Sequence, residues 1–97
     1  MKAVMITYNQ TLNDKIEFIL DRLDIRGFTR WNEIDGRGSE TGNPRMGTHT
    51  WPERNDATLV VIPDDKVDAL LGCIRAVDEL NTGVGIRAFV WNVERSY

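Results

Sequence analysis

Two helical periods, each enclosed between strand-like runs, restrict this chain of 97 residues to a small set of folds. In both segments apolar residues recur at the spacing of one helical face. The first face is made by Leu12, Ile16, Ile19, Leu20 and Leu23, and the second by Val67, Leu70, Leu71, Ile74 and Val77. Asp64 or Asp65 is the predicted N-cap of the second helix. Gly72 within that helix suggests close packing there, because a mid-helix glycine costs about 1 kcal/mol relative to alanine.

Strand-like runs surround both helices. We predict strands at residues 2–7, 28–34, 56–62 and 86–94, where β-branched and aromatic residues gather between turn residues. Pro63 closes the third run, because proline cannot continue a central ladder. The resulting order β-α-β-β-α-β has no internal linker, so residues 1–97 are expected to form one domain. This order predicts the α+β class and a ferredoxin-like arrangement, in which two helices cover one face of an antiparallel sheet.

The other face of such a sheet is left without cover. Trp31 is expected to point away from the helices, together with one alternating set of the fourth strand, either Phe89 and Trp91 or their neighbours. An apolar face of this kind is typical of an association surface in so small a domain. Self-association is therefore the first functional inference.

The segment of residues 36–55 has neither a helical nor a strand period. Unstructured loops longer than about a dozen residues are usually functional or disordered. Since a chain this short has little length to spare, the segment points to a role other than folding.

Charge and composition exclude several classes of function. The formal net charge of -3 lacks the Lys and Arg excess that nucleic acid or an anionic bilayer requires. No apolar run approaches the roughly 20 residues of a membrane span, and the N-terminus turns polar too early for a signal peptide. We therefore expect a cytoplasmic protein that neither inserts into membranes nor binds nucleic acid. The single cysteine, Cys73, is expected to be a small buried hydrophobe.

Five local strings, taken in order, resemble the P-II signal-transduction family over nearly the whole chain. They are "GFT" (27–29), "EIDGRG" (33–38), "VVIPDDKVDALLGCI" (60–74), "NTGVGIRAFV" (81–90) and "VERSY" (93–97). The resemblance implies a nitrogen regulatory protein of the P-II/CutA superfamily, not an enzyme, that forms a compact homotrimer with the sheets facing inward. Residues 36–55 would then be the loop that engages a partner protein, for example a membrane transporter.

The resemblance also implies an effector site in the clefts between subunits, with ATP, ADP or AMP as the candidate nucleotides. The positions that match the family's site are Thr29, Gly36, Arg37, Gly38, Gly83, Gly85 and Arg87. Glycines let backbone N–H groups approach phosphate oxygens, and arginines add charge-assisted hydrogen bonds. The alternative is that Gly83 and Gly85 only end a helix and turn the chain.

Two departures from the family pattern weaken the nucleotide prediction. The chain ends at Tyr97, without the family's usual C-terminal segment and its arginines, and the glycine-bearing turn is short and has no lysine. A smaller effector, or none, is the alternative. No tyrosine lies in the loop, so control by uridylylation is not expected.

Within the loop, the predicted partner contacts are Arg45, Met46, His49 and Trp51. Two alternatives stay open: Trp51 packs against its own domain, or His49 and Met46 hold a soft metal ion such as copper in a CutA-like trimer. An enzyme is not expected, because the chain has no Ser-His-Asp spacing and no Walker loop.

Overall fold

The computed structural model describes residues 1–36 and 54–97, and the predicted order of elements is confirmed in this part of the chain. The strands are β1 (Lys2–Asn9), β2 (Thr29–Ile34), β3 (Asn55–Ile62) and β4 (Ile86–Asn92). The helices are α1 (Asn13–Arg22) and α2 (Val67–Leu80), each preceded by one 3-10 turn, at Gln10–Leu12 and Asp64–Lys66.

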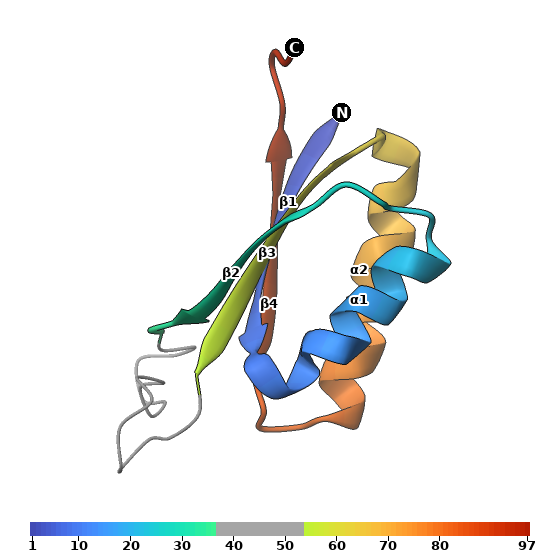
Figure 1. Cartoon of the computed structure of the whole chain (residues 1–97). Helices are drawn as coiled ribbons and strands as arrows, with labels where there is room; N and C mark the ends of the chain where they lie inside the picture. Colours follow the sequence, from blue (N-terminus) through green and yellow to red (C-terminus); the bar gives the residue numbers. More distant parts are fainter. Residues whose placement is uncertain (37–53) are drawn as a thin grey trace.

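The four strands form one antiparallel sheet in the order β2-β3-β1-β4. In the central ladder Val4 of β1 lies opposite Val60 of β3 on one side and Val90 of β4 on the other. Figure 1 shows both helices on the same face of this sheet, which leaves the opposite face open. This arrangement is the ferredoxin-like fold that the sequence predicts.

The core lies between the helices and the sheet. Alternation along β1 sends Val4, Ile6 and Tyr8 to the helix side, where each is at most 1% exposed. The predicted helical faces meet them there: the buried residues of the helical segments are Leu12, Ile16, Ile19, Leu20, Leu70 and Ile74. Cys73 is partly buried against this core, in agreement with its expected role as a small hydrophobe.

Two local predictions for the second helix are wrong. The 3-10 turn starts the helical segment at Asp64, so α2 begins at Val67 with Lys66 at the N-cap position and no side-chain cap. The Asp64 carboxylate instead contacts the Met1 amino group at 2.9 Å. A Cβ atom added at Gly72 would meet nothing within 4 Å, so no close packing requires this glycine.

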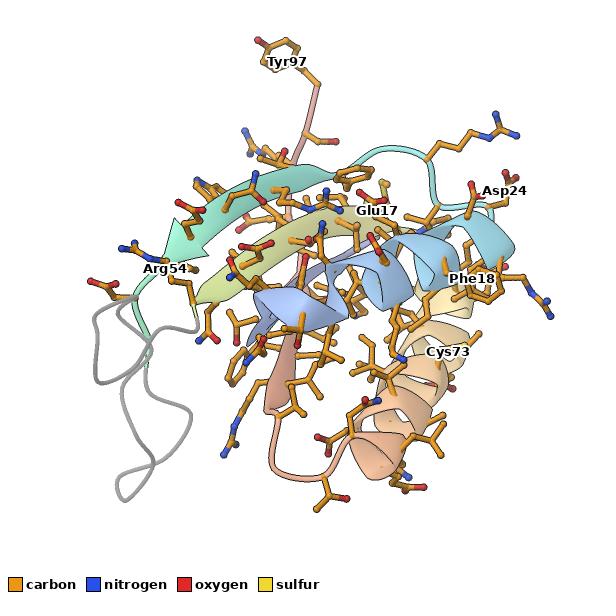
Figure 2. The ribbon with its side chains drawn as sticks, turned by 60° about the horizontal axis from the view of Figure 1, so that its bottom comes forward. Glu17, Phe18, Asp24, Arg54, Cys73 and Tyr97 are labelled. Carbon is orange, nitrogen blue, oxygen red and sulfur yellow. The ribbon has the colours of Figure 1, made fainter. Side chains whose placement is uncertain are left out.

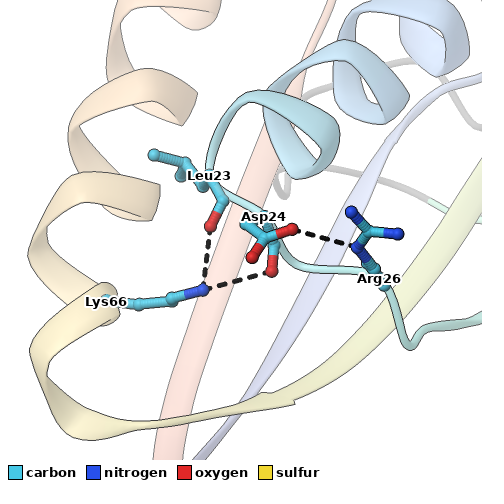
Figure 3. A network of polar contacts seen from close by, with 4 residues as sticks. All are labelled: Leu23, Asp24, Arg26 and Lys66. Carbon is cyan, nitrogen blue, oxygen red and sulfur yellow. Dashed lines mark hydrogen bonds and ion pairs between the residues drawn. The ribbon is translucent and has the colours of Figure 1, made fainter.

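Lys66 joins the end of α1 to the start of α2. Its Nζ donates to the carbonyl oxygens of Leu23 at 3.0 Å and Asp24 at 3.1 Å, as Figure 3 shows. The Asp24 carboxylate in turn accepts from Arg26 Nε at 3.0 Å. A cation at a helix C-terminus satisfies free carbonyl groups and interacts favourably with the helix dipole. The contact therefore holds the helical layer together at this end.

The open face of the sheet is apolar. Phe89 and Trp91 lie opposite Met5 and Ala3 of β1, so they point away from the helices. Trp31 lies opposite Ala57 on the same face. The side chains of Trp31, Phe89 and Trp91 are 44%, 55% and 48% exposed. The sequence did not show which alternating set of β4 residues lies on the open face. The strand register shows that this set contains Phe89 and Trp91.

Candidate functional site

The glycine-bearing turn and the base of the 37–53 segment lie at the same end of the sheet, the lower end in Figure 1. The end of β1 holds the two together. Asn9 N donates to Gly85 O at 3.2 Å, and the next residue, Gln10, donates from its backbone N to Arg54 O at 2.8 Å. The glycine turn and the base of the 37–53 segment are far apart in the sequence. Both are hydrogen-bonded to neighbouring residues at the end of β1.

The turn between α2 and β4 requires its glycines. Gly83 and Gly85 have φ angles of 85° and 97°, a region that residues with a Cβ atom rarely occupy. Asn81 closes the preceding helix, because its side-chain amide donates to Val77 O at 2.8 Å and its carbonyl accepts from Val84 N at 3.0 Å. The structural role of these glycines is confirmed, and their ligand role stays a prediction.

A strained bulge lies at the base of the 37–53 segment. Trp31 pairs with Ala57 and Ile34 with Asn55, so two residues of β2 lie opposite Asp56 alone. One of them, Glu33, has a φ angle of 55°. A non-glycine residue in this region costs on the order of 1–3 kcal/mol and persists only where its surroundings enforce it.

Asp56 of β3 and Arg54, which directly precedes β3, hydrogen-bond the backbone of Glu33. Asp56 is only 4% exposed, and its Oδ1 accepts from the backbone N of Glu33 at 2.9 Å. Arg54 Nη1 donates to Glu33 O at 3.4 Å, and Figure 2 shows the Arg54 side chain at this end of the sheet. The bulge has no signal in the sequence, because nothing in the residue type of Glu33 or Asp56 marks a register shift.

Gly36 lies just beyond the bulge, in close contact with Asn55. A Cβ atom added at Gly36 would lie 2.6 Å from Asn55 Nδ2, so any larger residue would force that side chain to move. The contact involves the flexible end of the Asn55 side chain and no backbone atom, so rotation of that side chain would make room for a larger residue.

The structure gathers part of the predicted effector site. Gly36, Gly83 and Gly85 lie at one end of the sheet, and Arg87 follows on the open face, opposite Thr7. Thr29 is the first residue of the edge strand β2 and pairs with Leu59 on the same face, so a single chain does not bring it to the glycines. The other predicted residues, Arg37, Gly38, Arg45, Met46, His49 and Trp51, lie outside the described residues.

Residues 1–36 and 54–97 contain neither a cluster of metal ligands nor a helix able to span a membrane. No three His, Cys, Asp or Glu side chains in these ranges group closely enough to hold a metal ion. None of the helices there has the length and apolar character of a membrane span.

The four-stranded antiparallel sheet, covered by two helices on one face and apolar on the other, defines a small α+β protein of the ferredoxin-like class. The family model of nitrogen regulatory protein P-II matches residues 1–97, so the chain belongs to the P-II family. No curated protein is significantly similar to it in sequence.

Solved structures support the same fold. The chain resembles CPII, a nitrogen regulatory PII-like protein from Thiomonas intermedia K12 bound to ADP, AMP and bicarbonate, with a TM-score of 0.76 and 18% identity over 99% of this chain and 92% of that one. A PII-like signaling protein from Thermus thermophilus aligns with a TM-score of 0.65 and 21% identity over 95% and 85% of the two chains. At these identities the likeness establishes the fold.

Proposed function

We propose that the chain is a cytoplasmic, homotrimeric P-II regulatory protein that binds an adenine nucleotide between its subunits. In this proposal residues 36–55 report the bound state to a partner protein such as a membrane transporter. The observation that carries the proposal is the joining of the glycine turn and the base of the 37–53 segment at the end of β1. A ligand that contacts the turn there lies next to the segment that signals.

The open sheet face supports the trimer. Trp31, Phe89 and Trp91 are about half exposed in the single chain, and Val61 beside them is 43% exposed. Burying apolar surface contributes roughly 25 cal/mol for each Å². Since the helices cover the opposite face, copies of this chain that pack through the open face would remove these side chains from water.

The sheet end supports an anionic ligand. Gly83 and Gly85 have positive φ angles, and glycine-rich turns of this kind are able to direct backbone N–H groups toward an anion; Arg87 follows two residues after Gly85 on the open face. If three chains pack through their open faces, Thr29 of one subunit can approach the glycines of another, which would complete the set that a single chain leaves apart. CPII, the structural neighbour, is bound to ADP and AMP, so these two nucleotides are the first to test.

Calorimetry and light scattering test the proposal together. We expect a trimer by light scattering, and ADP or AMP binding by titration calorimetry with one site for each subunit. Bicarbonate is added in a parallel titration, because CPII is bound to ADP and bicarbonate in another structure. A monomer that binds none of these ligands would refute the proposal.

A matched pair of arginine variants locates the site. Arg87→Ala should weaken ADP binding roughly tenfold or more, because a charge-assisted hydrogen bond contributes about 1.5–3 kcal/mol. Arg75→Ala is the control, since it removes the same side chain from an exposed position on α2. Equal ADP affinity in the two variants would place the nucleotide elsewhere.

A further inference from the structure

The bulge at Glu33 lies between the glycine turn and the segment that carries the proposed signal. Among the described residues, Glu33 and Asp24 are the non-glycine positions with positive φ, and Glu33 is the one inside the sheet. Asp24 belongs to the connection after α1, at the opposite end of that helix from the loop base. Glu33 is therefore the strained position that adjoins the predicted effector site.

Three hydrogen bonds at this end of the sheet lie between the glycine turn and the bulge. Gly85 O accepts from Asn9 N at the end of β1, Arg54 O accepts from Gln10 N, and Arg54 Nη1 donates to Glu33 O in β2. Asn9 is 1% exposed, so this residue is shielded from water. The glycine turn and the residue that precedes β3 are thus hydrogen-bonded to adjacent residues at the end of β1.

Asp56 makes a further hydrogen bond to the bulge. This residue is 4% exposed, and its carboxylate accepts the backbone N–H of Glu33 at 2.9 Å. This side chain thus holds the backbone N–H of Glu33, the residue of the bulge with positive φ.

We infer that Asp56 is a positioning residue that fixes the Glu33 bulge and couples it to the Gly83–Gly85 turn. It acts on the effector site through the backbone and does not touch the ligand. The inference rests on the proposed function, since the coupling concerns the nucleotide site and the segment that follows Gly36.

Three variants test this role with ADP as the probe. Asp56→Ala removes the acceptor and should weaken ADP binding about tenfold, while Asp56→Asn keeps an acceptor oxygen and should stay within about threefold of the wild type. Adding Glu33→Gly to Asp56→Ala should recover most of the affinity, because glycine adopts positive φ without support. Thr58→Ala is the control: it lies on the same strand and face, is fully buried, and loses one hydrogen bond to Tyr8.

Amide hydrogen exchange provides a readout that general destabilisation would not reproduce. In Asp56→Ala the Glu33 amide should exchange at least tenfold faster, whereas Thr58→Ala should leave its rate unchanged relative to neighbouring amides. In the wild type, ADP should slow exchange at both Asn9 and Glu33, and in Asp56→Ala only at Asn9.

The two proposals fail in different ways. A wild type that binds no nucleotide would refute the proposed function and, with it, the coupling, while the Glu33 exchange rates would still decide whether Asp56 holds the bulge. A wild type that binds ADP, together with an Asp56→Ala variant of unchanged affinity and unchanged Glu33 exchange, would overturn the positioning role alone.

Discussion

Alanine substitutions at two glycines should change stability in opposite directions. Gly72 lies in the middle of α2, and a Cβ atom there meets nothing within 4 Å. Gly72→Ala therefore adds helix propensity without a steric cost and should stabilise the fold by about 0.8–1 kcal/mol. Gly83 has equally open surroundings but a φ of 85°. Gly83→Ala should destabilise by roughly 1–2 kcal/mol, the cost of placing an L-residue in the left-handed region.

The two substitutions compare the effect of backbone conformation on stability, because neither new methyl group has a neighbour to contact. Thermal and urea unfolding followed by far-UV circular dichroism measure both changes, at equal protomer concentration because assembly contributes to apparent stability. For a domain of this size, 1 kcal/mol corresponds to a shift in Tm of about 4–8 °C. The expected shifts are thus upward for Gly72→Ala and downward for Gly83→Ala.

Each result can refute the reasoning. A loss of stability in Gly72→Ala would mean that another surface packs against this side of α2, and the open surroundings of Gly72 would then be wrong for the assembled protein. An unchanged Tm in Gly83→Ala would mean that the turn can form without a left-handed residue. ADP titration of the two variants adds a second comparison, in which Gly72→Ala should bind like the wild type.

Two further predictions concern polar contacts. Tyr8→Phe removes the hydroxyl that bonds Thr58 Oγ1 at 2.8 Å and Asn13 Oδ1 at 3.0 Å, so it should lower the free energy of unfolding by about 1–3 kcal/mol in urea titrations, and less in a Thr58→Val background. The hydrogen bond and charge of Arg26, followed by the charge of Lys66, lower the pKa of Asp24 below its ordinary value. The resulting stabilisation is present at neutral pH and is lost as the pH falls below about 4. Asparagine tolerates the positive φ, so Asp24→Asn should be less stable than the wild type at pH 7 and equally stable at pH 2 in urea titrations. The same difference in stability at both pH values would contradict this pH dependence.

Much of the fold follows from local patterns in the sequence. The helical period at residues 12–23 and 67–77 correctly identifies the faces that become buried, and Pro63 marks the end of β3. The patterns are less reliable at element ends, where competing contacts decide. Aspartate is a favourable N-cap residue, yet Asp64 begins the 3-10 turn, and its carboxylate contacts the Met1 amino group.

The candidate site was predictable only in part. Glycine is the residue type that positive φ favours, so the turn at Gly83 and Gly85 is visible in the sequence. The bulge at Glu33 is not, because glutamate has no preference for that backbone and Asp56 stabilises it from a different strand. The position of Thr29 on the edge strand β2, away from the glycine turn, likewise depends on its pairing with Leu59.

The sequence by itself determined the order of the strands and helices and which side of each helix is apolar, because periodicity is a property of neighbouring residues. Only the tertiary structure decided that Phe89 and Trp91 form the open face, and that Asn9 and Gln10 connect the glycine turn to the loop base. Strand register and hydrogen bonds between distant segments set these features, and residue type at any one position does not encode them.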